Sequence, residues 1–225
     1  MKADGTNVQK VFGDIASRSS PSWGPNGKRI AYSQNETVYI ATRDGKNVEV
    51  ITKGIYPHWS PNGKWIAFIL EPPGEGGKFG IGVFDIRTRT RKMVLENPRR
   101  PFIKAVRWSS DNSKLAFSWF NPEMFHLQTI YTMNSDGSEL QRGTKPARSF
   151  WADKPIWSPR GDELVYEHSG NGKSHIFKTR LRSRNAKQLT KEGRNYLGDW
   201  FDPTTLSVHP QANLLTTLWG ELKQK

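Results

Sequence analysis

The sequence of 225 residues contains no cysteine. Disulfides, thiolate zinc sites and cysteine nucleophiles are therefore excluded, although this absence leaves the compartment open. No apolar run approaches the roughly 18 residues that a membrane-spanning helix needs, so we expect no membrane span. The first residues are polar and do not resemble a signal peptide. Aromatic residues, by contrast, make up 12% of the chain, which argues against intrinsic disorder.

Acidic residues are also in short supply, with 21 Asp and Glu against 34 Lys and Arg, which gives a net charge of +13. Such an excess can attract an anionic partner. The basic residues concentrate in two runs, 87–107 and 173–191. In the first run Arg87, Arg89 and Arg91 alternate with threonines. In an extended strand these arginines would share one face and form a row suited to phosphate or carboxylate groups.

A motif close to Trp-Ser-Pro-Asn-Gly-Lys, followed by an apolar segment, recurs along the chain. Its tryptophans are Trp23, Trp59, Trp108 and Trp157, at spacings of 36, 49 and 49 residues, and a degenerate fifth copy contains Trp200. Each unit holds short apolar segments separated by turn signals such as Asn-Gly and Asp-Gly. No segment shows a 3.6-residue apolar stripe, so helices should be few. Four strands in each unit of this length predict the blades of a β-propeller.

We therefore predict an all-β fold, a β-propeller of four-stranded antiparallel blades that forms a single domain over residues 1–225. The second strand of each unit is predicted at 29–33, 65–70, 114–119 and 163–167. The motif tryptophans should fill the space between blades. The predicted blades cover approximately 13–53, 54–98, 99–145, 146–192, and a composite fifth blade of 193–225 with 1–12.

The composite blade would tie the two ends of the chain together and remove exposed sheet edges. It is predicted because the first twelve residues resemble the end of a unit, with an Asp-Gly turn, and the last residues resemble the start of one. The alternative is that the chain is a piece of a longer propeller, in which Met1 falls at an arbitrary point of a blade.

The repeated Trp-Ser-Pro-Asn-Gly-Lys-x-Ile-Ala-Phe motif resembles the WD-like repeats of the TolB-like β-propeller family, from the first residues to about Phe201. The resemblance implies a bacterial β-propeller that mostly binds proteins. The best-known member is periplasmic and works with outer-membrane lipoproteins, so the resemblance suggests a periplasmic location, which the sequence itself leaves unknown. Related propellers cap the catalytic domains of some serine peptidases. The third copy departs from the motif, with Ser110 and Asn112 in place of Pro and Gly.

The motifs of several enzyme and metal-site classes are missing from the sequence. It has no Gly-x-Ser-x-Gly nucleophile elbow and no Asp-x-Asp-x-Asp-Gly calcium loop. The glycine-rich stretch 74–80 lacks the following Gly-Lys-Ser/Thr and helix of a nucleotide loop. We therefore expect no catalytic residues, no metal and no cofactor. None of the histidines has the spacing of a zinc-hydrolase site: His58, His126, His168, His175 and His209.

Several side chains are candidates for a partner-binding surface. His58 precedes a motif tryptophan and could point into the central channel, although a polar residue of the channel wall is the commoner explanation. Trp119, Phe120, Phe150 and Trp151 flank loops and are out of phase with the motif tryptophans, so we predict that they face a ligand.

The leading hypothesis is a non-catalytic, monomeric scaffold that binds a protein or peptide. One alternative is a polyanion binder that uses the basic outer strands, with Arg87, Arg89 and Arg91 as contacts. Basic edge strands also prevent edge-to-edge aggregation, which is the first explanation of the two basic runs. A steep salt dependence would distinguish polyanion binding from protein binding. A second alternative is the accessory propeller of a hydrolase whose catalytic domain is absent from the chain.

Overall fold

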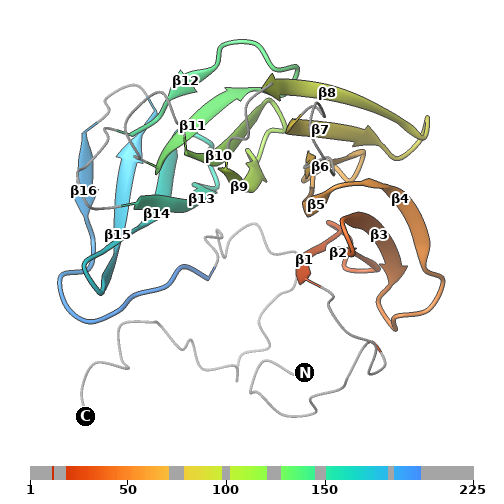
Figure 1. Ribbon diagram of the computed structural model, residues 1–225, viewed down its shortest axis with the longest axis horizontal. Coiled ribbons are helices and arrows are strands. Elements are labelled where there is room, and N and C mark those ends of the chain that lie inside the picture. The colour runs from red at the N-terminus through yellow and green to blue at the C-terminus, as the bar shows by residue number, and fades with distance from the viewer. Residues whose placement is uncertain are drawn as a thin grey trace, which may run out of the picture.

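The computed structural model describes residues 12, 19–70, 79–97, 102–120, 128–144, 151–181 and 185–198. Its sixteen strands form four antiparallel sheets of four strands each, in the meander order of propeller blades. The sheets follow one another around an arc, and the first strand of each sheet lies innermost (Figure 1). Within these ranges the structure contains no helix, and hence none long and apolar enough to span a membrane. The predicted all-β architecture of four-stranded blades is confirmed.

The second strand of each blade begins at the predicted residue, and that of the fourth blade continues three residues beyond its predicted end. Blade 1 contains β1 (Ser19–Trp23), β2 (Arg29–Gln34), β3 (Thr37–Thr42) and β4 (Glu49–Lys53). Blade 2 contains β5 (Ile55–Trp59), β6 (Trp65–Leu70), β7 (Phe79–Asp85) and β8 (Thr90–Asn97). Blade 3 contains β9 (Phe102–Trp108), β10 (Lys114–Phe120), β11 (Gln128–Asn134) and β12 (Gln141–Arg142). Blade 4 contains β13 (Trp151–Trp157), β14 (Glu163–Gly170), β15 (Lys173–Arg180) and β16 (Ala186–Gln188).

The Ser-Pro-Asn-Gly motif recurs in the chain because it forms the turn between the first two strands of a blade. In blade 2, the Ser60 hydroxyl accepts the Trp65 N–H at 2.9 Å, and the Gly63 N–H donates to the Ser60 carbonyl oxygen at 2.9 Å. Gly63 has a φ of +72°, which glycine adopts without steric cost. In blade 3, Asn112 takes the glycine position with a φ of +65°. Asparagine tolerates this conformation, so the divergent third copy keeps the same turn.

The motif tryptophans of blades 2, 3 and 4 pack against the preceding blade, as predicted. Trp59, Trp108 and Trp157 are 3%, 4% and 5% exposed. The Trp108 indole N–H donates to the backbone carbonyl of His58 at 3.2 Å, and the Trp157 indole donates to that of Arg107 at 3.1 Å. Each bond crosses from one blade to the innermost strand of the one before. Trp108 and Trp157 therefore hold adjacent blades together by both burial and a directed hydrogen bond, and Trp59 does so by burial.

Trp23 occupies the same motif position in blade 1 but is 53% exposed. Blade 1 is the first blade in the described part of the chain, so no described blade precedes it. The composite blade predicted from 193–225 and 1–12 would have to cover this face. Apart from Phe12 and residues 193–198, those segments lie outside the described ranges.

Every innermost strand contains a bulge three residues before the motif tryptophan. At each bulge two residues oppose a single aromatic residue of the second strand. The first bulge residue has a φ between +50° and +54° although it is not glycine. The bulge residues with positive φ are Ser20, Tyr56, Ala105 and Lys154. The opposed aromatic residues, all buried, are Tyr32, Phe68, Phe117 and Tyr166.

Candidate functional site

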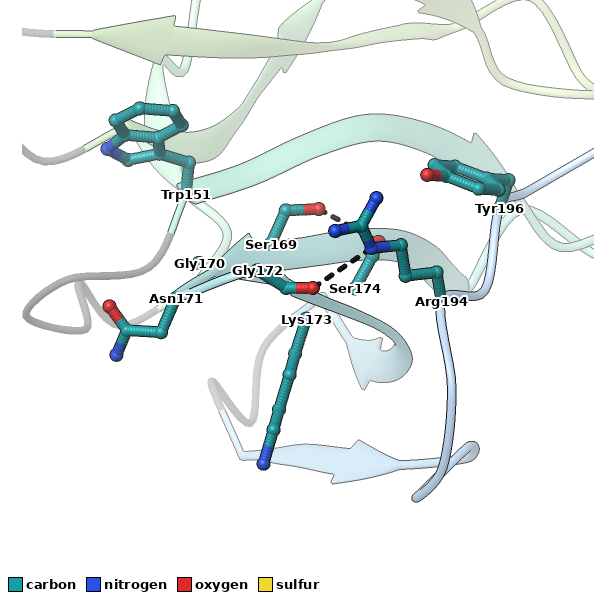
Figure 2. A pocket seen from close by; sticks show the side chains of 9 residues that line it. All are labelled: Trp151, Ser169, Gly170, Asn171, Gly172, Lys173, Ser174, Arg194 and Tyr196. Atoms are coloured by element: carbon teal, nitrogen blue, oxygen red, sulfur yellow. Dashed lines mark hydrogen bonds between the residues drawn. The ribbon is translucent and has the colours of Figure 1, made fainter.

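A groove of about 520 Å³ lies on blade 4, between the start of β13, the β14–β15 hairpin and the chain that follows β16 (Figure 2). Two large aromatic side chains line it while remaining exposed: Trp151 is 59% exposed and Tyr196 is 64% exposed. Exposed aromatic residues that gather around one hollow commonly mark an interaction site. This groove is therefore our candidate functional site.

The floor of the groove includes a tight hairpin turn. Asn171 and Gly172 connect β14 to β15 with φ values of +50° and +75°. Two consecutive residues of positive φ form the type I′ turn that Asn-Gly favours between antiparallel strands. The Ser169 and Ser174 hydroxyls, on either side of this turn, lie 2.9 Å apart and form a hydrogen bond. The hairpin thus presents a fixed backbone surface to the groove.

The chain after β16 is anchored along this hairpin. The Asn195 N–H donates to the Ser174 carbonyl oxygen at 2.9 Å, and the Ser174 hydroxyl donates to the Asn195 carbonyl oxygen at 2.9 Å. The Arg194 Nε–H donates to the Gly172 carbonyl oxygen at 3.1 Å. These bonds hold Arg194 and Tyr196, which flank Asn195 in the sequence, at one side of the groove, opposite Trp151.

A buried carboxylate fixes the next residue of the same segment. Glu167 of β14 is 4% exposed and accepts the Leu197 N–H at 2.8 Å. Its other oxygen lies 3.1 Å from the Lys154 ammonium nitrogen. The same Lys154 nitrogen lies 5.7 Å from the centre of the Tyr196 ring, within the range of a cation–π contact. Tyr196 is therefore restrained both through the backbone and through its ring.

The predicted aromatic candidates have different locations in the structure. Trp151 lines the groove. Trp119 is 8% exposed and packs in the core against Phe117 and Tyr131, with a centroid distance of 4.9 Å to the latter. Phe120, at the end of β10, is partly buried. Phe150 lies outside the described residues. Among the described aromatic candidates, Trp151 lines the groove and Trp119 and Phe120 do not.

His58 lies at the contact between blades 2 and 3, where its Nδ1 accepts the Trp108 N–H at 3.5 Å. Burial, with a further contribution from the positive charge of Arg107, holds the pKa of His58 well below its ordinary value of 6.5. The side chain is therefore neutral near pH 7 and serves as an acceptor between blades. No group of three residues able to hold a metal ion occurs in the described ranges.

Because His58 is buried and neutral, we expect the protein to lose stability in mild acid. Because the folded-state pKa of His58 is lowered, only the unfolded chain binds a proton as the pH falls below about 6.5, which favours unfolding. Each such group contributes at most about 1.4 kcal/mol per pH unit within that window. Burial also lowers the pKa of His168, with a smaller effect from His175, so His168 adds to the slope. Urea unfolding measured from about pH 7 to pH 5 should show this decline.

The matched variant is His58→Asn, because the asparagine side-chain oxygen can accept the Trp108 N–H but does not titrate. We expect its free energy of unfolding to fall less steeply with acidification than that of the wild type. Equal slopes in the two proteins would show that His58 binds a proton as readily in the folded protein as in the unfolded chain.

Arg87, Arg89 and Arg91 do not form the row on one strand face that the sequence predicts. Arg87 and Arg89 lie in the β7–β8 turn, and Arg91 alone lies within β8. Arg89, with a φ of +61°, pairs with Glu49 of blade 1 and lies over the Phe84 ring. The Arg91 guanidinium lies 3.5 Å from the Thr52 hydroxyl. Arg89 and Arg91 thus connect the outer strands of blades 1 and 2.

Two cations of the second basic run, 173–191, form ion pairs within blade 4. The Lys178 ammonium lies 3.0 Å, and the Arg180 Nε 3.3 Å, from the carboxylate of Glu163 on the neighbouring strand. These hydrogen bonds, that from Lys178 first, lower the pKa of Glu163. Both basic runs therefore have structural roles in the described sheets.

Comparison with known proteins agrees with this architecture. The family model described as the TolB beta propeller domain matches residues 33–208. TolB from Acinetobacter baumannii is similar with a TM-score of 0.67 and 22% identity, covering 84% of this chain and 47% of that chain. The putative TolB from Agrobacterium tumefaciens has a TM-score of 0.68 and 21% identity, covering 85% and 67%.

The fold is also shared with propeller-containing enzymes. Acylaminoacyl peptidase from Pyrococcus horikoshii has a TM-score of 0.57 and 20% identity, covering 80% of this chain and 33% of that chain. A search of curated proteins finds no match. The chain spans about half the length of the Acinetobacter TolB structure, at 47%. Because the family model matches most of the sequence, including all or part of each blade, the chain belongs to the TolB β-propeller domain family.

Proposed function

We propose that this β-propeller is a non-catalytic scaffold that binds a protein or peptide partner in the groove between Trp151 and Tyr196. The observation that carries the proposal is the pair of exposed aromatic side chains on opposite sides of one groove. Tryptophan and tyrosine supply large contact areas with few rotatable bonds and are enriched among the residues that dominate binding energy.

The rigidity of the groove supports the same proposal. Binding costs less when the contact surface is already ordered. The segment that carries Arg194 and Tyr196 is held by hydrogen bonds to Ser174, Gly172 and Glu167. A volume of about 520 Å³ also suits a few side chains of a bound segment.

The polar groups of the groove favour binding over catalysis. Nucleophilic serines need a neighbouring general base. The two serines of the groove, Ser169 and Ser174, form a hydrogen bond with each other, and Ser174 also bonds the Asn195 carbonyl. In the part of the chain that the structure describes, no histidine or carboxylate lines this groove.

Selection of random peptides by phage display on the whole chain tests the proposal. Peptides enriched on the wild type should bind Trp151→Ala at least about tenfold more weakly, because the variant removes half of the aromatic pair. Trp23→Ala is the matched control, since Trp23 is a similarly exposed tryptophan on blade 1. The proposal is wrong if no peptide is enriched, or if the enriched peptides bind Trp151→Ala and the wild type equally.

A further inference from the structure

The groove has a one-sided charge. Among the described residues, its lining includes Lys173 and Arg194 but no aspartate or glutamate. Two acids of the same blade are engaged elsewhere, because Glu167 pairs with Lys154 and Glu163 pairs with Lys178 and Arg180. A hollow that contains cations without acids favours an anionic group in the occupant.

Arg194 is oriented to contact such a group. A guanidinium has five N–H donors, and the bond to the Gly172 carbonyl uses the one on Nε. Figure 2 shows the two terminal nitrogens directed toward the space between Trp151 and Tyr196, whereas Lys173 points away from it. Each terminal nitrogen can donate to one oxygen of a planar anion, in the paired geometry that arginine forms with carboxylates.

We infer that the groove binds an acidic peptide segment, whose carboxylate pairs with Arg194 while neighbouring apolar side chains contact Trp151 and Tyr196. This inference rests on the proposed function and specifies its ligand. The carboxylate comes either from an Asp or Glu side chain or from a peptide C-terminus. A polyanion would instead require several cations along a track. Of the two described cations that line this groove, Arg194 is the one that faces the space between the aromatic rings.

Four labelled octapeptides test the inference by fluorescence anisotropy on the full chain. Glu alternates with Leu in one sequence and Gln with Leu in the other, and each is made with a free and with an amidated C-terminus. At least one carboxylate-bearing peptide should bind about tenfold more tightly than the amidated Gln peptide, the gain typical of a paired arginine–carboxylate contact. If the Glu peptide still binds more tightly than the Gln peptide when both are amidated, the carboxylate that pairs with Arg194 is a side chain. If amidation removes the preference, that carboxylate is the peptide C-terminus.

Arg194→Gln should remove this preference, so that the carboxylate-bearing peptides and the amidated Gln peptide bind the variant with equal affinity. Arg160→Gln is the control, because it deletes the same charge from an exposed turn of the same blade. Equal binding of all four peptides overturns the inference. It is also overturned if Arg160→Gln weakens binding as much as Arg194→Gln, or if heparin alone binds and does so through Arg194, which would indicate a polyanion ligand.

The two proposals fail in different ways. If the four peptides bind equally but all lose affinity in Trp151→Ala, the groove is a peptide site without a preference for acids, and only the inference fails. If Trp151→Ala leaves every peptide's affinity unchanged, the proposed function itself fails.

Discussion

Replacing Trp108 by alanine should lower the free energy of unfolding by about 3–5 kcal/mol, because the change empties a closed space between two blades. The indole is 4% exposed, stacks on Trp65 of blade 2 with ring centroids 5.9 Å apart, and donates to the His58 carbonyl oxygen. A domain is commonly stable by only about 5–15 kcal/mol, so the variant should unfold at much lower denaturant concentration. Urea unfolding followed by circular dichroism measures the loss.

Trp23→Ala provides the matched control for this prediction. Trp23 has the same motif position but is 53% exposed, so its removal should cost less than about 1 kcal/mol. A loss as large as that of Trp108→Ala would show that a further blade covers Trp23 and would support the composite blade. If Trp108→Ala itself costs less than about 1 kcal/mol, the tryptophan is not the main contact between blades.

Gly137→Ala should cost about 2–5 kcal/mol, the combined effect of backbone strain and a clash. Gly137 lies in the turn after β11 and has a φ of +96°. An added Cβ would overlap the carbonyl oxygen of Val94 in β8 of the preceding blade. Because this obstacle is backbone, it cannot rotate away, and blades 2 and 3 would have to separate. The midpoint of thermal unfolding should fall accordingly.

Gly27→Ala separates the two contributions to that loss. Gly27 has a φ of +65°, but an added Cβ there would meet nothing within 4 Å. It should therefore show the backbone strain alone, about 1–2 kcal/mol. Equal losses for the two variants would contradict the close approach between blades.

The blades could be predicted from the sequence because their signals are local. Each Ser-Pro-Asn-Gly turn sets the start of the next strand within a few residues of the motif tryptophan. The apolar second strands are equally clear, since residues such as those of β10 are buried on both faces between neighbouring blades. That double burial also explains the position of Trp119. A strand covered on both faces lacks the alternation that would distinguish an inward side chain from an outward one.

The groove could be predicted only in part. Trp151 can be predicted because it flanks a loop and is out of phase with the motif tryptophans, and the Asn171-Gly172 turn is a recognisable hairpin signal. Arg194, Tyr196 and Glu167 have no such signal. Their positions depend on contacts across 21 to 30 residues of sequence, between the chain after β16 and the hairpin. Contacts of that range follow from the folded arrangement of the blade rather than from any short motif.

The bulges of the innermost strands restrict the kind of recognition that this propeller can use along its axis. An exposed strand edge can accept a peptide as an added β-strand, through a continuous row of main-chain donors and acceptors. Here each inner edge is interrupted by a bulge, and in three of the four strands the bulge includes a proline, which has no N–H: Pro21, Pro57 and Pro155. A segment entering the axis would therefore be recognised through side chains and not through β-augmentation.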